Sequence, residues 1–274
     1  MKLLGIIVLY NCNLFESVSY KKCAEAGLAN ENFSLFVYDN SPVAQHTQSE
    51  LSDYKIVYVS DTSNPGVSKA YNTGTRYAKE HGFDWVLLLD QDTDFQDNTY
   101  VEQVFSRIEN NHNVLFVPQV VKRGADVFSP LPMWHHIPRG KQYEPEHSYS
   151  LKKVSIINSG MLVKVDAFFN SGGYNEKVPL DLADYQFIYR LQKKYPEFYL
   201  MDYKLVQSFS NDVDNTESLK FRFKSYCVSA LHYEADFITK SDILFSMLKR
   251  CMSLLLRTKD FSFMRIMFKT IVKR

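Results

Sequence analysis

The chain has 274 residues, of which 45% are hydrophobic and 15% aromatic, and its 32 basic residues nearly balance 31 acidic ones. That length suits one large domain, or a domain with an appendage. A formal net charge of +1 gives the molecule as a whole no electrostatic basis for binding nucleic acid. Four scattered cysteines without a C-x-x-C pair argue against a zinc site or a disulfide framework and are typical of reduced thiols in a cytosolic protein.

The apolar run at 2–10, KLLGIIVLY, resembles the start of a signal peptide. It stops at Asn11, however, and no small-residue cleavage site follows. We therefore predict a buried first strand. No uncharged apolar run approaches the roughly 20 residues that span a bilayer, so a soluble or peripheral protein is expected.

The first half alternates short apolar runs with helical patterns. Strands are predicted at 2–10, 34–40, 55–61 and 83–90, with helices near 16–29 and 66–80 between them. Farther along we predict a helix at 97–110, a strand at 114–121, a long surface loop at 122–153, a strand turning into a short helix at 154–168, and a helix at 180–194. Strands alternating with helices predict βαβ units and a mostly parallel sheet covered on both faces.

Polar residues follow four of these predicted strands. They are Tyr10 and Asn11, Asp39 to Ser41, Asp61, and Asp90 to Asp92. Any one of them would suit an ordinary turn or helix cap. Four strands that all end in this way predict a ligand site, because parallel strands bind ligands beyond their carboxyl ends.

Asp90 and Asp92 project from the same side of an extended backbone, and two like charges so close need a cation. Mg²⁺ or Mn²⁺, with a bound diphosphate, would satisfy them. Phosphatases of the haloacid dehalogenase type also carry Asp-x-Asp after a strand. That motif wants Thr or Val where this chain has Asp94, and it lies on the first strand, so we disfavour it.

The stretch 63–95, SNPGVSKAYNTGTRYAKEHGFDWVLLLDQDTDF, resembles the nucleotide-sugar half of the inverting glycosyltransferases of family 2. LLLDQD is most similar to the bacterial rhamnosyltransferase branch. The matching positions are Asn64, Gly66, Ala70, Asn72, Gly74, Asp90 and Asp92. Gly66 would allow a tight turn, and the helix N-terminus there would favour a diphosphate.

The stretch 157–191 resembles the acceptor half of the same family, in which a Ser-Gly strand precedes Gly-Gly-Tyr-Asn-Glu and an acidic helix start. The Ser-Gly pair is Ser159 and Gly160, the position of the catalytic base is Asp184, and Asp181 matches a further acid of the rhamnosyltransferase branch. The chain departs from the family pattern at Ala183, at Gln186 and at Gln207, where relatives carry Glu, an acid and His. These departures leave a non-catalytic sugar-nucleotide-binding homologue open.

The resemblance implies an α/β fold of the GT-A type, a Rossmann-like mixed and mostly parallel sheet flanked by helices. It implies a divalent metal on Asp92 and Asp90, and a nucleotide-sugar site at Tyr10, Asn11, Asp39, Asn64, Gly66, Lys69, Asn72 and Asp90. Asp184 would take a proton from the acceptor hydroxyl in an inverting displacement. L-Rhamnose from dTDP-rhamnose is the expected donor, and UDP-galactose, UDP-glucose or UDP-galactofuranose is the alternative.

The predicted loop 122–153 contains aromatic residues and histidines. His135, His136 and His147 fit no zinc spacing. With Trp134 and Tyr143 nearby, we expect a lid on the acceptor side, together with Asp181, Ser159 and Gly160.

The C-terminal stretch 243–274 mixes apolar with basic residues and holds a single acid, Asp260. Basic amphipathic helices of this kind bind anionic membranes, although a helix packed on the main domain is the alternative. We therefore expect a glycosyltransferase domain at 1–240, with a nucleotide-sugar half at 1–121 and an acceptor half at 122–240, and a membrane-binding tail at 241–274. The expected acceptor is a lipid-linked saccharide for O antigen or capsule, at the inner face of a bacterial cell membrane.

Overall fold

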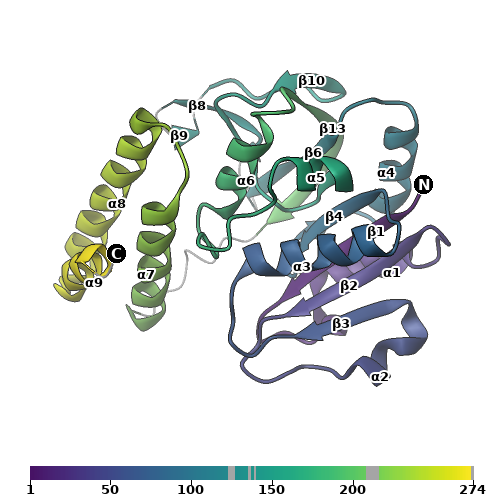
Figure 1. Cartoon of the computed structure of the whole chain (residues 1–274), viewed down its shortest axis with the longest axis horizontal. Helices are drawn as coiled ribbons and strands as arrows, with labels where there is room; N and C mark the ends of the chain where they lie inside the picture. Colours follow the sequence, from purple (N-terminus) through teal and green to yellow (C-terminus); the bar gives the residue numbers. More distant parts are fainter. Residues whose placement is uncertain (123–126, 135–136, 139, 208–215, 273–274) are drawn as a thin grey trace.

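The structure is a computed structural model that describes residues 1–122, 127–134, 137–138, 140–207 and 216–272. Within these residues, ten strands form one mixed sheet with helices on its faces, and three helices lie beside it at the C-terminus (Figure 1). The predicted α/β class with a mostly parallel, helix-flanked sheet is confirmed.

The first half of the chain supplies the parallel part of the sheet. Its strands are β1 (Leu3–Leu9), β2 (Phe33–Asp39), β3 (Ile56–Ser60), β4 (Trp85–Asp90) and the short β5 (Asp94–Phe95). Its helical elements are η1 (Leu14–Glu16), η2 (Tyr20–Ala24), α1 (Glu25–Gly27), α2 (Gln48–Leu51), η3 (Ser52–Tyr54), α3 (Val67–Glu80) and α4 (Tyr100–Glu109). The helix predicted near 16–29 is present but shorter, at 18–27, and it contains the π turn η2, while η1 before it is a separate 3₁₀ turn.

The second half continues the sheet and adds the C-terminal helices. Its strands are β6 (Leu115–Lys122), β7 (Val127–Ser129), β8 (Leu131–Trp134), β9 (Ile137–Pro138), β10 (His147–Ser150), β11 (Val154–Ser155), β12 (Met161–Lys164) and β13 (Glu197–Gln207). Its helices are α5 (Val165–Asn170), α6 (Ala183–Leu191), α7 (Thr216–His232), α8 (Phe237–Thr258) and α9 (Ser262–Val272). The prediction of a plain loop at 122–153 is wrong, because strands cross its described part.

The strand order is β10-β13-β6-β12-β4-β1-β2-β3, and β12 runs antiparallel to both of its neighbours. In the parallel part, Val8 pairs with Asp90 and Leu9 with Asp39, while Asp39 pairs with Ser60. The carboxyl ends of β4, β1, β2 and β3 therefore lie in line, as the polar residues that follow these strands predicted.

Helices cover both faces of the sheet. Leu4 and Ile6 of β1 point into a core that includes residues of α3, α5 and α6. Leu3 and Ile7 point to the opposite face, against residues of η2 and α4. Because alternate residues of a strand face opposite sides, the continuous apolar run in β1 is explained by burial on both faces.

The start of α3 packs closely against the segment that leads into α6. Gly66 has a φ of +93°, and a Cβ at this position would lie 2.3 Å from the carbonyl oxygen of Pro179. The hydroxyl of Ser68 donates to the carbonyl of Val178 over 2.5 Å. Glycine at 66 is therefore required both by its backbone conformation and by the approach of a chain segment from the second half.

The C-terminal helices form a third, smaller core. Phe223 and Cys227 of α7 pack with Met247 of α8 and with Phe263 and Met267 of α9. Residue 241, where we expected the tail to begin, lies inside α8 rather than at its start. Within the residues that the structure describes, no helix is long and apolar enough to cross a membrane.

The contact at Gly66 can be tested by comparing Gly66→Ala with Gly82→Ala. Gly82 also has a positive φ of +70°, but a Cβ there meets nothing within 4 Å. Both changes carry a backbone cost of about 1–2 kcal/mol. Gly66→Ala should cost about 1–3 kcal/mol more, because Pro179 must move. Denaturant unfolding measures the difference, and equal stability of the two variants would contradict the close contact.

Candidate active site

Asp90, at the end of β4, is held by three side chains. The hydroxyl of Tyr71 donates to one carboxylate oxygen over 3.0 Å, and the hydroxyl of Ser159 donates to the other over 2.7 Å. The amide of Gln207 approaches the second oxygen at 3.4 Å. We had expected Ser159 on the acceptor side. Its side chain is fully buried, however, and it bonds to Asp90 instead.

Asp92 lies at the surface two residues farther on, with its carboxylate facing the same site. The surrounding protein atoms and the charge of Asp90 raise the pKa of Asp92 to about 6. The raised pKa means that the negative charge of Asp92 is disfavoured by desolvation and by repulsion from Asp90. A divalent cation would offset this repulsion.

Few protein side chains in the described residues are placed to act as ligands of such a cation. Across the described parts of the chain, no group of three or more His, Cys, Asp or Glu residues is arranged to hold a metal. Gln207, which stands where relatives carry a His, faces Asp90 with its amide. Asp92 and Asp90 therefore fit a metal that takes its remaining ligands from diphosphate and water, as Mg²⁺ commonly does.

Asp184 lies in the first turn of α6, after Leu182, whose φ of +69° is rare for a branched side chain. The backbone N–H of Tyr185 donates to its carboxylate over 2.9 Å. Burial, with a smaller contribution from the charge of Asp90, raises the pKa of Asp184 to about 7. A carboxylate in this range suits a general base at neutral pH, which is the role the sequence predicted.

The ends of β1 and β2 form the opposite edge of the site. Tyr10 is 46% exposed, and the backbone N–H of Asn11 donates to the hydroxyl of Ser41 over 2.8 Å. Asp39 is fully buried, and its carboxylate accepts hydrogen bonds from the backbone of Ser41 and Gln45 and from the hydroxyl of Tyr58.

Burial alone would raise the pKa of Asp39, but these hydrogen bonds lower it below the ordinary value. Asp39 therefore shapes the loop beside Asn11 and offers no exposed oxygen to a ligand. Tyr10 and Asn11 keep the accessible positions at this edge.

The start of α3 differs from the expected phosphate site. The backbone N–H of Ser68 points to the carbonyl of Pro179 at 3.4 Å, so a peptide group already covers this helix N-terminus. Asn64, with a φ of +51°, and Gly66 shape the turn before it.

Asn72 and Lys69 of α3 contact the second half of the chain instead of an open site. The side chain of Asn72 bonds both backbone groups of Tyr174 and the carboxylate of Glu176, and Lys69 pairs with Glu176 at 3.4 Å. Both side chains, which we expected in the nucleotide-sugar site, thus join the two halves of the chain.

The remaining predicted acceptor residues lie apart from each other. Asp181 faces Arg250 of α8 at 3.7 Å. Gly160 is a packing position, because a Cβ there would lie 2.6 Å from Leu205. Trp134 belongs to β8, but its side chain lies outside the described residues, as do His135 and His136.

Gln186 has a structural role that the sequence did not reveal. It is fully buried, its amide oxygen accepts from the backbone N–H of Glu234, and its amide nitrogen donates to the carbonyl of Glu234. Gln186 therefore anchors the segment between α7 and α8 to α6.

The family model of glycosyl transferase family 2 matches residues 6–169, which is more than half of the chain. A curated relative, dTDP-rhamnosyl transferase RfbF of Shigella flexneri, is 25% identical over 128 residues, which cover 46% of this chain and 43% of the relative. The chain thus matches less than half the length of that relative.

Two solved structures share the fold. TarS 1–349 from S. aureus superposes with a TM-score of 0.57 at 16% identity, covering 96% of this chain and 74% of TarS. The mannosyltransferase PcManGT from Pyrobaculum calidifontis, solved with GDP-Man and Mn²⁺, gives a TM-score of 0.54 at 11% identity, covering 92% and 72%. The predicted GT-A architecture is confirmed, and the chain belongs to glycosyl transferase family 2.

Proposed function

We propose that this protein transfers L-rhamnose from dTDP-rhamnose, with inversion, onto a lipid-linked saccharide during the synthesis of a bacterial surface polysaccharide such as O antigen or capsule. The observation that carries the proposal is the half-buried carboxylate of Asp184, with a pKa raised to about 7 by burial and by the charge of Asp90. The choice of donor is supported by the identity shared with a relative named dTDP-rhamnosyl transferase.

The proposed reaction uses Asp184 as the general base. Its carboxylate accepts the proton of the acceptor hydroxyl as that oxygen attacks the anomeric carbon, and the diphosphate leaves from the opposite face. Displacement in one step inverts the anomeric configuration without a covalent enzyme intermediate. The N–H of Tyr185 orients the carboxylate, and partial burial keeps it basic enough to take the proton.

On the donor side, Tyr71 and Ser159 fix the orientation of Asp90, while Asp92 remains accessible. A divalent ion on these carboxylates, Mg²⁺ or Mn²⁺, would neutralise the charge of the diphosphate. Tyr10 and Asn11 both follow the carboxyl end of β1, beside the end of β2, where a nucleoside would bind.

Two alternatives remain distinct from the main proposal. A UDP-hexose or UDP-galactofuranose donor would need the same carboxylates and differ only in the nucleoside and sugar contacts. A non-catalytic sugar-nucleotide-binding protein draws its support from Gln207, which occupies the place of a His beside Asp90.

The C-terminal helices carry a surface suited to a membrane. Phe245, Leu248, Met252 and Leu256 of α8 are between 48% and 74% exposed. Their spacing of three or four residues puts them on one face of the helix. Lys249 flanks this stripe and is exposed as well.

Helix α9 also exposes apolar side chains beside basic ones. Phe268 and Val272 are 56% and 82% exposed, and Arg265 and Lys269 lie beside them on the surface. Exposed apolar side chains among basic ones favour the interface of an anionic bilayer. We propose that this face holds the enzyme at the cytoplasmic side of the cell membrane, where lipid-linked acceptors lie.

Calorimetric titration with dTDP and UDP, each with and without Mg²⁺ or Mn²⁺, tests the donor site. We expect metal-dependent binding of dTDP that exceeds that of UDP, and loss of the metal dependence in Asp92→Asn. Preference for UDP would move the donor to a hexose within the same family. A folded protein that binds neither nucleotide would refute the proposed function.

Asp184→Asn tests the base. Transfer should fall by about 10²–10⁴-fold while dTDP binding persists, because the amide cannot accept the proton. In the wild type, Asp184 is protonated and inactive below its pKa of about 7, so the rate should rise with pH and level off above that value. Asp202→Asn, an exposed site on β13, is the matched control and should leave the rate unchanged. Unchanged transfer in Asp184→Asn would favour the non-catalytic alternative.

Sedimentation with vesicles that contain phosphatidylglycerol tests the membrane face. Phe245→Glu combined with Leu256→Glu should weaken binding roughly tenfold or more, because two apolar side chains lose their burial in the interface. Val43→Glu changes an equally exposed apolar residue (73%) of the first half and should have no effect. If the Phe245→Glu/Leu256→Glu variant bound vesicles as well as the wild type, this surface would not be the membrane-binding site.

A further inference from the structure

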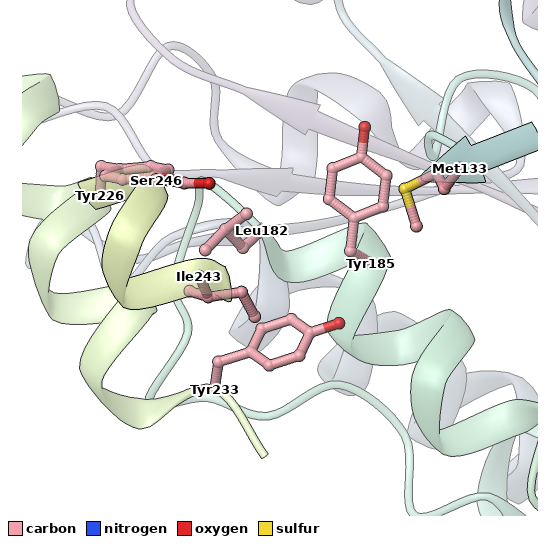
Figure 2. Close-up of a pocket in the computed structure, with 7 residues that line it drawn as sticks. All are labelled: Met133, Leu182, Tyr185, Tyr226, Tyr233, Ile243 and Ser246. Carbon is pink, nitrogen blue, oxygen red and sulfur yellow. The ribbon is translucent and has the colours of Figure 1, made fainter. Parts of the chain in front are cut away.

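A recessed cavity of about 120 Å³ lies between α6 and the C-terminal helices. Three tyrosines, Tyr185, Tyr226 and Tyr233, line it together with Leu182, Ile243 and Ser246. Figure 2 shows that these side chains come from α6 and the residue before it, from α7 and the segment after it, and from α8, with Met133 of β8 at one side. The cavity is therefore made jointly by the family domain and the C-terminal helices.

The tyrosine hydroxyls of this cavity are not satisfied by the protein. Tyr226 and Tyr233 are only 8% and 5% exposed. Within the described residues, none of the three hydroxyls forms a hydrogen bond to another protein group. None of the three oxygens is among the fully enclosed unpaired atoms of the described residues, so each remains available to bond a polar ligand in the cavity that these side chains line.

The size and lining of the cavity suit a single sugar ring. A water molecule needs about 10–15 Å³ by the same measure, so the space holds roughly ten water-sized groups, about the heavy atoms of one hexose. Aromatic rings and aliphatic side chains can cover the apolar C–H faces of a pyranose, while the hydroxyls of tyrosine and serine can bond its hydroxyl groups.

The cavity lies next to the proposed base. Tyr185 follows Asp184 directly in α6, and Leu182 precedes it by two residues. Burial raises the pKa of Tyr233 and of Tyr185, and the negative charge of Asp184 raises both further. That influence places the carboxylate within electrostatic reach of both hydroxyls.

Specific contacts fix the C-terminal helices in this position. Arg250 of α8 pairs with Asp181 at 3.7 Å and lies over the ring of Tyr226 at 4.5 Å. Arg190 of α6 pairs with Glu234, which follows Tyr233, at 2.6 Å. These ion pairs connect both walls of the cavity, so the tyrosines from α7 and its following segment are held against α6.

We propose that this cavity binds the sugar of the acceptor that receives the transferred residue, so that the C-terminal helices supply part of the acceptor site in addition to a membrane surface. The inference rests on the proposed function, because it takes Asp184 as the base. In this arrangement Tyr185, Tyr226 and Tyr233 select the acceptor sugar, and Asp181 with Arg250 acts as a positioning pair.

Saturation-transfer NMR tests the proposal with a panel of methyl glycosides of rhamnose, glucose, galactose and N-acetylglucosamine. The full chain is used, with saturating dTDP or UDP and Mg²⁺. We expect at least one glycoside to bind. Ser246→Trp fills the cavity and should weaken that binding about tenfold or more. Ser253→Trp, the same change at an exposed position of α8, should retain it.

Tyr233→Phe keeps the ring and the fold but removes one hydroxyl, and should weaken binding severalfold even if Ser246→Trp is unstable. Nucleotide titration on the same samples separates the two proposals. The acceptor-cavity proposal is refuted if the glycosides bind equally to all variants. It is also refuted if the wild type binds nucleotide but no glycoside, and in both cases the proposed glycosyltransferase function still stands. Loss of nucleotide binding from the wild type would instead refute the proposed function.

Discussion

The active site depends on the contact between the start of α3 and the segment that enters α6. Ser68 and Asn72 of α3 bond the backbone of this segment at Val178 and Tyr174. These bonds hold a loop of the second half against a helix of the first half, and the loop delivers Asp184 to the neighbourhood of Asp90. The proposed mechanism needs Asp90 and Asp184 at one substrate, and their relative position then depends on this set of hydrogen bonds between the two halves.

Three carboxylates lie close together in a partly desolvated place, those of Asp90, Asp92 and Asp184. Their charge repulsion destabilises the ligand-free protein. Burial and mutual repulsion raise the pKa of Asp92 to about 6 and that of Asp184 to about 7. In the proposed mechanism, the same environment lets Asp92 bind a cation and lets Asp184 accept a proton. Tyr71 and Ser159 donate hydrogen bonds to Asp90 and fix its orientation.

The C-terminal helices face two ways. Toward the main domain, Arg250 pairs with Asp181 and lies over the ring of Tyr226, and Tyr226 lines the tyrosine-lined cavity together with residues of α6 and α8. Toward solvent, apolar residues such as Phe245 and Leu256 remain uncovered. The surface that we propose for membrane binding and the cavity that we propose for the acceptor therefore share helix α8.

The sequence by itself determined the parallel sheet, the alignment of its strand ends, the Asp90–Asp92 pair and the position of Asp184, because these follow from apolar periodicity and from local motifs. It did not determine the roles of Asn72 and Gln186 or the strand β13, because their partners lie far away along the chain. Only the tertiary structure decided which of the polar residues bond to other parts of the protein and which remain exposed. The physical reason is that burial and hydrogen-bond partners are set by packing between distant segments, on which local sequence carries little information.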